Sequence, residues 1–134
     1  MVVERSQTVH ERVNRIISAC KSRLASACFT TDLWTSRAMD AYISLTAAFI
    51  DESWALHRWV PNIRPFPEVS HTSDNIVVEL DDMIEDIGFT ESLPMYITND
   101  NGANVVLAAN KCRYCIELRC VCHTLQVRVF YIFF

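Results

Sequence analysis

The chain has 134 residues, of which 51% are apolar, so it is long enough for one domain with one core and too apolar to be disordered. Only two glycines occur, which excludes the glycine-rich phosphate loops of P-loop and Rossmann-type proteins. The formal net charge is −4, so the chain lacks the basic surface of a domain that binds nucleic acid by itself.

The start of the chain and its cysteines indicate the compartment. The segment Met1–Arg5 leads into a polar stretch and does not have the form of a secretory signal. No run of about 18 apolar residues occurs, so no membrane span is expected. Without a signal, the six cysteines are interpreted as reduced intracellular thiols rather than as a disulfide framework.

Residues 1–26 are expected to form an N-terminal segment that packs on the core. Within it, residues 7–24 are predicted to form an amphipathic helix, which Thr8 and Glu11 would begin with a capping box. Apolar side chains recur on one face of this helix at three- and four-residue spacing: Val9, Val13, Ile16, Ile17, Cys20 and Leu24.

Residues 27–126 are expected to form the main domain, which opens with three strands. The runs 27–34 and 42–50 are joined by a short connection, which predicts an antiparallel pair. A third strand is predicted over 55–60, and it is expected to end there because prolines cannot donate to a sheet. The prolines that follow are Pro61, Pro65 and Pro67. The aromatic residues of this region are interpreted as core or edge packing rather than as a platform for bases: Trp54, Trp59 and Phe66.

A helix is predicted next. It begins near His71–Ser73 and ends before Gly88, a residue suited to the left-handed position after a helix. One face is apolar and the other is acidic, which is typical of a solvated helix surface. The strand predicted over 93–98 follows this helix. A strand reached through a helical crossover is expected to lie parallel to its neighbour in the sheet.

The remaining pattern predicts a helix over 101–110, a strand over 116–121 and a further element that starts at His123. The complete order, β-β-β-α-β-α-β, predicts an α/β domain. Residues 127–134 are nearly all apolar and β-prone without polar alternation. If exposed, this apolar tail is an aggregation hazard.

Two aspartates occur in or directly after β-prone runs, where Asp is disfavoured. Asp32 lies within the run Phe29–Ser36, and Asp100 follows the fourth predicted strand. A turn or cap is one explanation, since Asp100, Asn101 and Gly102 make a good turn sequence. The other explanation is a pair of strand-borne carboxylates that hold a divalent metal ion.

Four motifs occur in an order that resembles a known family. They are Thr-Thr-Asp-Leu-Trp-Thr-Ser at 30–36, His-Thr-Ser-Asp-Asn-Ile at 71–76, Thr-Asn-Asp-Asn-Gly-Ala-Asn at 98–104 and Cys-Val-Cys-His-Thr-Leu-Gln at 120–126. Together they resemble the hAT-type transposases and the zinc finger BED domain-containing proteins derived from them. The resemblance implies an RNase H-like five-stranded mixed sheet with flanking helices, truncated here, in which the first and fourth strands are neighbours. In the family a helix begins after the His-Thr-Leu-Gln motif, so residues 127–134 depart from the pattern and are interpreted as a tail left by a truncated or misjoined gene product.

In such a core, Asp32 and Asp100 would be the first two acids of an Asp-Asp-Glu triad. They would serve as catalytic residues and as ligands of Mg²⁺ or Mn²⁺, which favour oxygen donors. The family's third acid lies downstream, beyond the end of this chain. Glu117 precedes the Cys-x-x-His motif and does not occupy that place. The resemblance therefore implies an incomplete transposase-like core with no activity as an isolated chain.

The resemblance also assigns residues around the two acids. Cys120 and His123 form a motif that is expected near the site, with His123 as a supporting or substrate-side hydrogen-bond donor. Four further residues are expected on the substrate side: Trp34, Thr35, Asn101 and Asn104.

A structural zinc site is the rival interpretation of the same region. Cys112-x-x-Cys115 and Cys120-x-x-His123 place four soft ligands within twelve residues. The spacing within each pair suits zinc, but the separation between the pairs is short. We therefore expect that His123 does not share a zinc ion with Cys112 and Cys115, and that zinc belongs to a BED finger outside this chain.

Three functions follow from these observations. The first is a fragment of a hAT transposase-derived, BED-type nuclear protein that binds DNA through regions outside this chain, forms homo-oligomers at full length and no longer catalyses. The second is an active transposase or nuclease core completed by missing segments. The third is an interaction scaffold of RNase H-like shape without a nucleic-acid role. The nucleus is implied by the resemblance alone.

Overall fold

The structure is a computed structural model that describes residues 26–51, 53–66, 70–88 and 94–125. The helix expected over 7–24 and the apolar tail expected over 127–134 lie outside the described residues. The described residues fall within the expected main domain, apart from Ser26.

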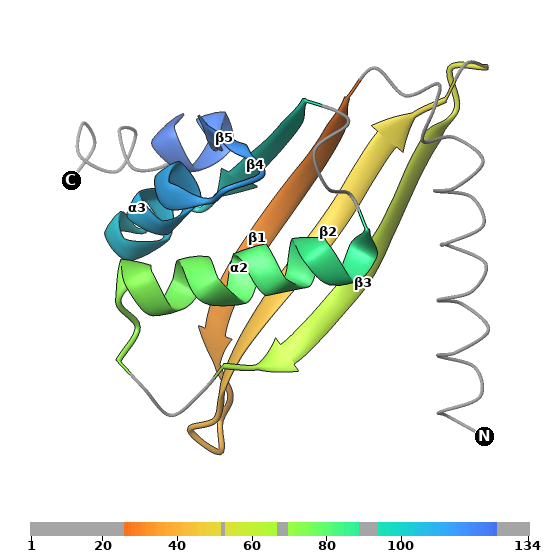
Figure 1. The fold of residues 1–134 in the computed structure, drawn as a ribbon. Helices are drawn as coiled ribbons and strands as arrows, with labels where there is room; N and C mark the ends of the chain where they lie inside the picture. Colours follow the sequence, from red (N-terminus) through yellow and green to blue (C-terminus); the bar gives the residue numbers. More distant parts are fainter. Residues whose placement is uncertain (1–25, 52, 67–69, 89–93, 126–134) are drawn as a thin grey trace, which may run out of the picture.

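The described residues form a mixed five-stranded sheet (Figure 1). Its strands are β1 (Ala27–Thr35), β2 (Ala41–Ile50), β3 (Leu56–Pro65), β4 (Met95–Asn99) and β5 (Ile116–Arg119). They are arranged in the order β3-β2-β1-β4-β5. The first three pair antiparallel, whereas β4 lies parallel to both β1 and β5. The α/β class, the parallel fourth strand and the adjacency of the first and fourth strands are confirmed.

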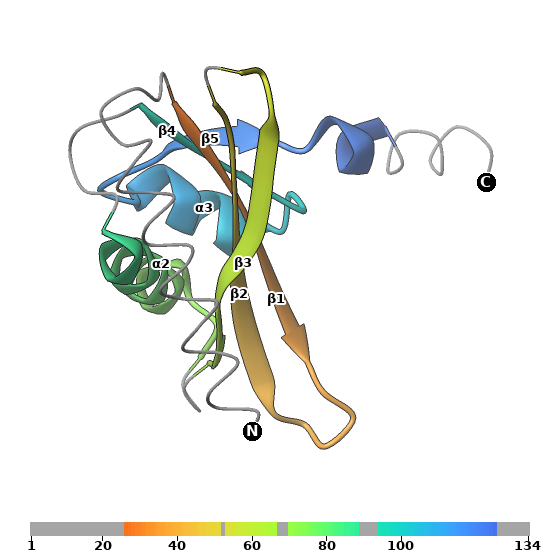
Figure 2. The same ribbon diagram turned by 90° about the vertical axis from the view of Figure 1, so that its right-hand side faces the viewer.

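Two helices, α2 (Ser73–Ile87) and α3 (Ala103–Lys111), cover one face of the sheet (Figure 2). The Thr72 side chain accepts the backbone N–H of Asn75 and caps the start of α2. Gly88 ends α2 with φ 75°, a left-handed conformation that glycine adopts without a side-chain clash. None of the described helices is long and apolar enough to cross a membrane.

The core lies between this sheet face and the two helices. Alternation along β1 buries Phe29 and Thr31 toward the helices and turns Thr30 and Asp32 toward the other face. The Thr31 hydroxyl donates to the backbone carbonyl of Ser44 at 2.9 Å, which satisfies this buried polar group. The largest fully buried side chains come from the sheet and from α2: Phe29, Ile43, Leu45, Ile76, Leu80, Met83, Ile84 and Ile97.

Strand β3 is longer than the sequence predicts, because it continues through Pro61 to Pro65. The pairing of β3 with β2 shifts register at this point: Leu45 faces Asn62 whereas Ala47 faces Trp59. The extra residues form a bulge on an edge strand, where a missing N–H donor leaves no gap in the pairing. The prediction that the prolines exclude regular pairing was therefore wrong.

The aromatic residues of this region differ in burial. Phe66 is buried and Trp59 packs against the core, as expected. Trp54, at the turn between β2 and β3, is 86% exposed and has a positive φ of 63°. Its interpretation as a packing residue was wrong, because the tight turn directs its side chain into solvent.

Candidate functional site

Asp32 and Asp100 lie at the same level of neighbouring strands and on the same face of the sheet. Thr30 of β1 pairs with Thr98 of β4 in parallel register, and each aspartate lies two residues beyond its threonine. Side chains two residues apart on a strand point to the same face. Both carboxylates are exposed on the face opposite α2 and α3. The structure thus brings together the two acids that the sequence singled out.

The chain turns immediately after Asp100. Its Oδ1 accepts the backbone N–H of Gly102 at 3.0 Å, and this turn orients the carboxylate before α3 begins. A Cβ atom built on Gly102 would lie 3.1 Å from the same Oδ1, so a larger residue would press on the carboxylate. The turn and the metal explanations of this aspartate are compatible, because one oxygen makes the turn while the other is available.

Cys120 lies at the same level, directly after a third strand. Leu118 of β5 pairs with Thr98 of β4, so Cys120 follows at the level of Asp100. Residues 121–125 then form a helical turn, from which His123 reaches back. Its Nδ1 lies 3.2 Å from the Cys120 sulfur.

The charges around His123 show its position relative to the acids. The hydrogen bond with Cys120 is the main cause that raises the pKa of His123, and it lowers the pKa of Cys120. The carboxylates of Asp100 and Asp32 raise the pKa of His123 further through their negative charge. The histidine therefore belongs to the electrostatic environment of both acids.

Glu117 points away from this site. It pairs in register with Ile97, whose side chain is buried under the helices, so both lie on the helix-covered face. One carboxylate oxygen of Glu117 is buried and has no hydrogen-bond partner among the described residues. Glu117 is therefore not placed to act with Asp32 and Asp100.

The two asparagines expected on the substrate side hold the ends of helices. The Asn101 side-chain amide donates to the Cys120 carbonyl at 3.2 Å and to the Thr124 hydroxyl at 3.0 Å. The Asn104 amide donates to the carbonyl of His71 at 2.7 Å. Both contacts fix elements around the acids, and a substrate role for either residue stays a prediction.

Trp34 and Thr35 lie at the end of β1, next to Asp32. The Trp34 ring stacks on Tyr42 with centroids 5.7 Å apart and is 38% exposed. Thr35 is exposed and pairs with Ala41 at the end of the β1–β2 ladder. Their substrate roles likewise stay predictions, although Trp34 presents an accessible aromatic surface two residues from Asp32.

Comparison with protein families identifies the domain. A model described as the ZBED1 RNase-like domain matches residues 30–124, which is more than half of the chain. The chain belongs to the ZBED1 RNase-like domain family. The matched range begins two residues before Asp32 and ends one residue after His123. A search of curated proteins finds no match to the chain.

The donor set of this domain fits a weakly held divalent cation. Two adjacent carboxylates offer the oxygen ligands that Mg²⁺ and Mn²⁺ prefer. The Asp32 backbone pairs with Ser44 of β2, but its carboxylate forms no hydrogen bond or ion pair with the side chains of the other described residues, so its charge is available. Within the described part of the chain, however, no group of three or more His, Cys, Asp and Glu side chains could enclose an ion. Such a cation would keep most of its water.

The four soft ligands of the rival zinc interpretation are divided between two places. Cys112 and Cys115 lie at the end of α3 and just before β5, whereas Cys120 and His123 follow β5. The five residues from Cys115 to Cys120 span about 16 Å when extended. One tetrahedral zinc ion cannot reach both pairs across that distance.

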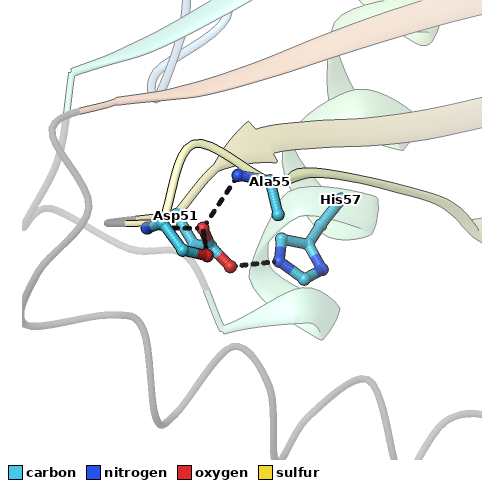
Figure 3. A network of polar contacts seen from close by, with 4 residues as sticks. Asp51, Ala55 and His57 are labelled. Carbon is cyan, nitrogen blue, oxygen red and sulfur yellow. Dashed lines mark hydrogen bonds and ion pairs between the residues drawn. The ribbon is translucent and has the colours of Figure 1, made fainter.

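A polar network at the β2–β3 turn was missed by sequence reasoning (Figure 3). Asp51 Oδ1 accepts the backbone N–H groups of Ser53 and Ala55 at 2.9 and 3.0 Å, and Oδ2 lies 2.7 Å from His57 Nε2. These hydrogen bonds, with that of His57 the largest, hold the pKa of Asp51 far below its ordinary range. The signal in the sequence was an Asp followed by a Ser two residues later and a His six residues later.

An apolar hollow of about 420 Å³ lies toward the opposite end of β1 from the acids. It is lined by the residue before β1, by residues of β1, β2 and β3, and by Trp54 of the β2–β3 turn: Ser26, Cys28, Ala48, Phe49, Ile50, Trp54 and Leu56. Because no charged side chain lines it, the hollow is unsuited to phosphate groups and is separate from the acidic site.

Proposed function

We propose that this chain is part of a hAT transposase-derived, BED-type nuclear DNA-binding protein whose RNase H-like domain does not cleave DNA by itself. The observation that carries the proposal is the placement of Asp32 and Asp100 at one level of neighbouring parallel strands. This is the position of the first two acids in the transposase cores that the chain resembles. Membership of the ZBED1 RNase-like domain family supports the same descent.

The proposed lack of DNA cleavage follows from the number of carboxylate ligands that the domain offers to metal ions. Phosphoryl transfer with two metal ions needs ligands for both ions, so that the attacking and leaving oxygens are each held. Asp32 and Asp100 supply two carboxylates, and Glu117 lies on the opposite face of the sheet. Retained metal binding would therefore be weak and would not support cleavage.

The charge distribution indicates that DNA is bound mainly by other regions of the protein. The net charge of −4 opposes a polyanion. The solvent side of α2 is acidic, and several of its carboxylates already pair with basic residues. Arg64 contacts Asp86 at 2.6 Å and Lys111 contacts Asp74 at 2.6 Å. A basic surface outside this domain, together with self-association, would provide the affinity.

An active core is the second candidate, because the geometry of the two acids is intact. In that case a segment outside the described residues or a second chain would supply the third acid. The two candidates differ in what the chain does to DNA once a divalent ion is present.

The deciding experiment is incubation of the full 134-residue chain with Mn²⁺ and either supercoiled plasmid or transposon-end DNA. We expect neither nicking nor strand joining. The Asp100→Asn variant is the matched control, since it removes one carboxylate and keeps the size of the side chain. Cleavage by the parent chain that disappears in Asp100→Asn would overturn the proposal in favour of the active core.

A further inference from the structure

The loop between α3 and β5 brings two cysteines together at a place that the acidic site does not use. Cys112 caps the end of α3, where its backbone N–H donates to the Ala109 carbonyl at 3.3 Å. Cys115 immediately precedes β5. Residues 113 and 114 bend the chain between the two cysteines.

A hydrogen bond connects this pair of cysteines to α2. The Cys112 thiol donates to Asp81 Oδ1 at 3.2 Å. The same oxygen accepts the backbone N–H of Arg113 at 3.0 Å. Asp81 therefore holds both the thiol and the loop that carries it. The Cys112 and Cys115 side chains are close enough that each shifts the pKa of the other.

These contacts make the two sulfurs chemically unequal. The contact with Cys115 lowers the pKa of Cys112, whereas the same contact and burial raise the pKa of Cys115. Asp81 acts in the opposite direction and raises the pKa of Cys112. A pair with one favoured thiolate and one retained thiol has the asymmetry of an attacking and a resolving cysteine.

We propose that Cys112 and Cys115 are a reversible dithiol–disulfide pair that hydrogen peroxide oxidises. The Cys112 sulfur attacks one peroxide oxygen, the O–O bond breaks, and a sulfenic acid and one water form. The Cys115 sulfur then displaces the hydroxyl group as a second water and the S–S bond forms. Two thiols lose two electrons and two protons, and one peroxide becomes two waters.

The placement of the pair favours a reversible bond over a structural one. A disulfide that closes a loop of only four residues constrains the unfolded chain little, so it adds little stability. All described cysteines are free thiols, in keeping with a reducing compartment. Oxidation would remove the proton that Cys112 donates to Asp81 and would release one contact between the loop and α2. This inference does not depend on the proposed function.

The test is peroxide treatment of the full chain, followed by alkylation of the remaining thiols and mass spectrometry. We expect the number of alkylated cysteines, six in the reduced chain, to fall by two and to recover with dithiothreitol. Trypsin supplies a specific readout, because it cleaves after Lys111 and after Arg113. The peptides 112–113 and 114–119 should then remain joined only through the disulfide.

Three variants complete the test. Cys115→Ser should abolish the joined peptides, whereas Cys122→Ser, which removes an exposed thiol, should keep them. Asp81→Asn should speed oxidation, because it removes a charge that opposes the Cys112 thiolate. Circular dichroism reports whether each variant is folded. A folded parent chain that yields no joined peptides, or that joins Cys112 to Cys120 or Cys122, would overturn the proposal, and unchanged or slower oxidation of Asp81→Asn would refute the role of Asp81.

Discussion

Asp32 and Asp100 each lie two residues beyond the register pair Thr30 and Thr98, so their carboxylates leave neighbouring parallel strands at one level and on one face. No lysine, arginine or histidine of the described residues forms a direct ion pair with the Asp32 carboxylate. The two like charges are therefore uncompensated by a direct ion pair, and a divalent cation would relieve their repulsion.

This arrangement predicts weak binding of Mn²⁺ that needs both acids. Asp32→Asn and Asp100→Asn should each abolish the line broadening that Mn²⁺ causes in NMR signals of nearby residues. Asp82→Asn carries the same charge change on the exposed face of α2 and should leave the broadening in place. Glu117→Gln should also leave it in place, because Glu117 lies on the helix-covered face. Loss of binding in Glu117→Gln would contradict the assigned geometry.

The Cys120–His123 contact predicts a measurable titration. The pKa of His123 should lie above its ordinary value of 6.5, so the ring stays protonated to higher pH than a free histidine. Cys120→Ser should lower this pKa most, because the sulfur is the main cause of the shift, and Asp100→Asn should lower it less. The imidazole proton shifts in an NMR pH titration measure both changes. A larger decrease in the pKa of His123 in Asp100→Asn than in Cys120→Ser would show that Cys120 is not the main cause of the shift.

The Asp51 network predicts a loss of stability in acid. The pKa of Asp51 is lower in the folded chain than in the unfolded chain, where it is near the ordinary 3.8. Its contribution is therefore complete above that value and is lost as the pH falls further toward the folded pKa. Urea unfolding of the parent chain and of Asp51→Asn should show a stability difference at neutral pH that shrinks below about pH 4. A difference that grows in acid would exclude this explanation.

The left-handed end of α2 predicts a specific cost at Gly88. Gly88→Ala should destabilise the fold by about 1 kcal/mol, because a residue with a Cβ atom has a strained backbone at a positive φ. A Cβ at this position meets no atom within 4 Å, so the cost comes from the backbone and not from crowding. Gly88→Asn should cost less, since asparagine tolerates this conformation. Equal losses in the two variants, measured by urea unfolding, would argue against a backbone origin.

Much of the fold could be predicted from local patterns, because alternation and helical spacing report burial directly. The strand that contains Asp32 and the helix that ends at Gly88 were both predicted close to their observed bounds. Local rules failed at Pro61, where an edge-strand bulge tolerates proline, and at Trp54, where a tight turn prevents packing. Both outcomes depend on the partner strand and the turn geometry, which short sequence windows do not contain.

The candidate site was predictable only in part. The order of strands came from the sequence, but the adjacency of Asp32 and Asp100 came from the family resemblance. The contact of Cys112 with Asp81 joins α3 to α2 and has no local signal at all. The residues Asp51, Ser53 and His57 could be seen in the sequence, but only the folded hairpin shows that their side chains converge.

The parallel pairing of β1 with β4 also determines the order in which the strands pair during folding. Strands β1, β2 and β3 pair with sequence neighbours, whereas β4 can join β1 only after the chain has closed a long loop through β3 and α2. Such nonlocal pairings carry a larger loop-closure entropy and form late in folding. In a partly folded chain that has formed only the antiparallel strands β1, β2 and β3, Asp100 would not yet lie beside Asp32. Cation binding would thus select the completed fold and raise its apparent stability by mass action.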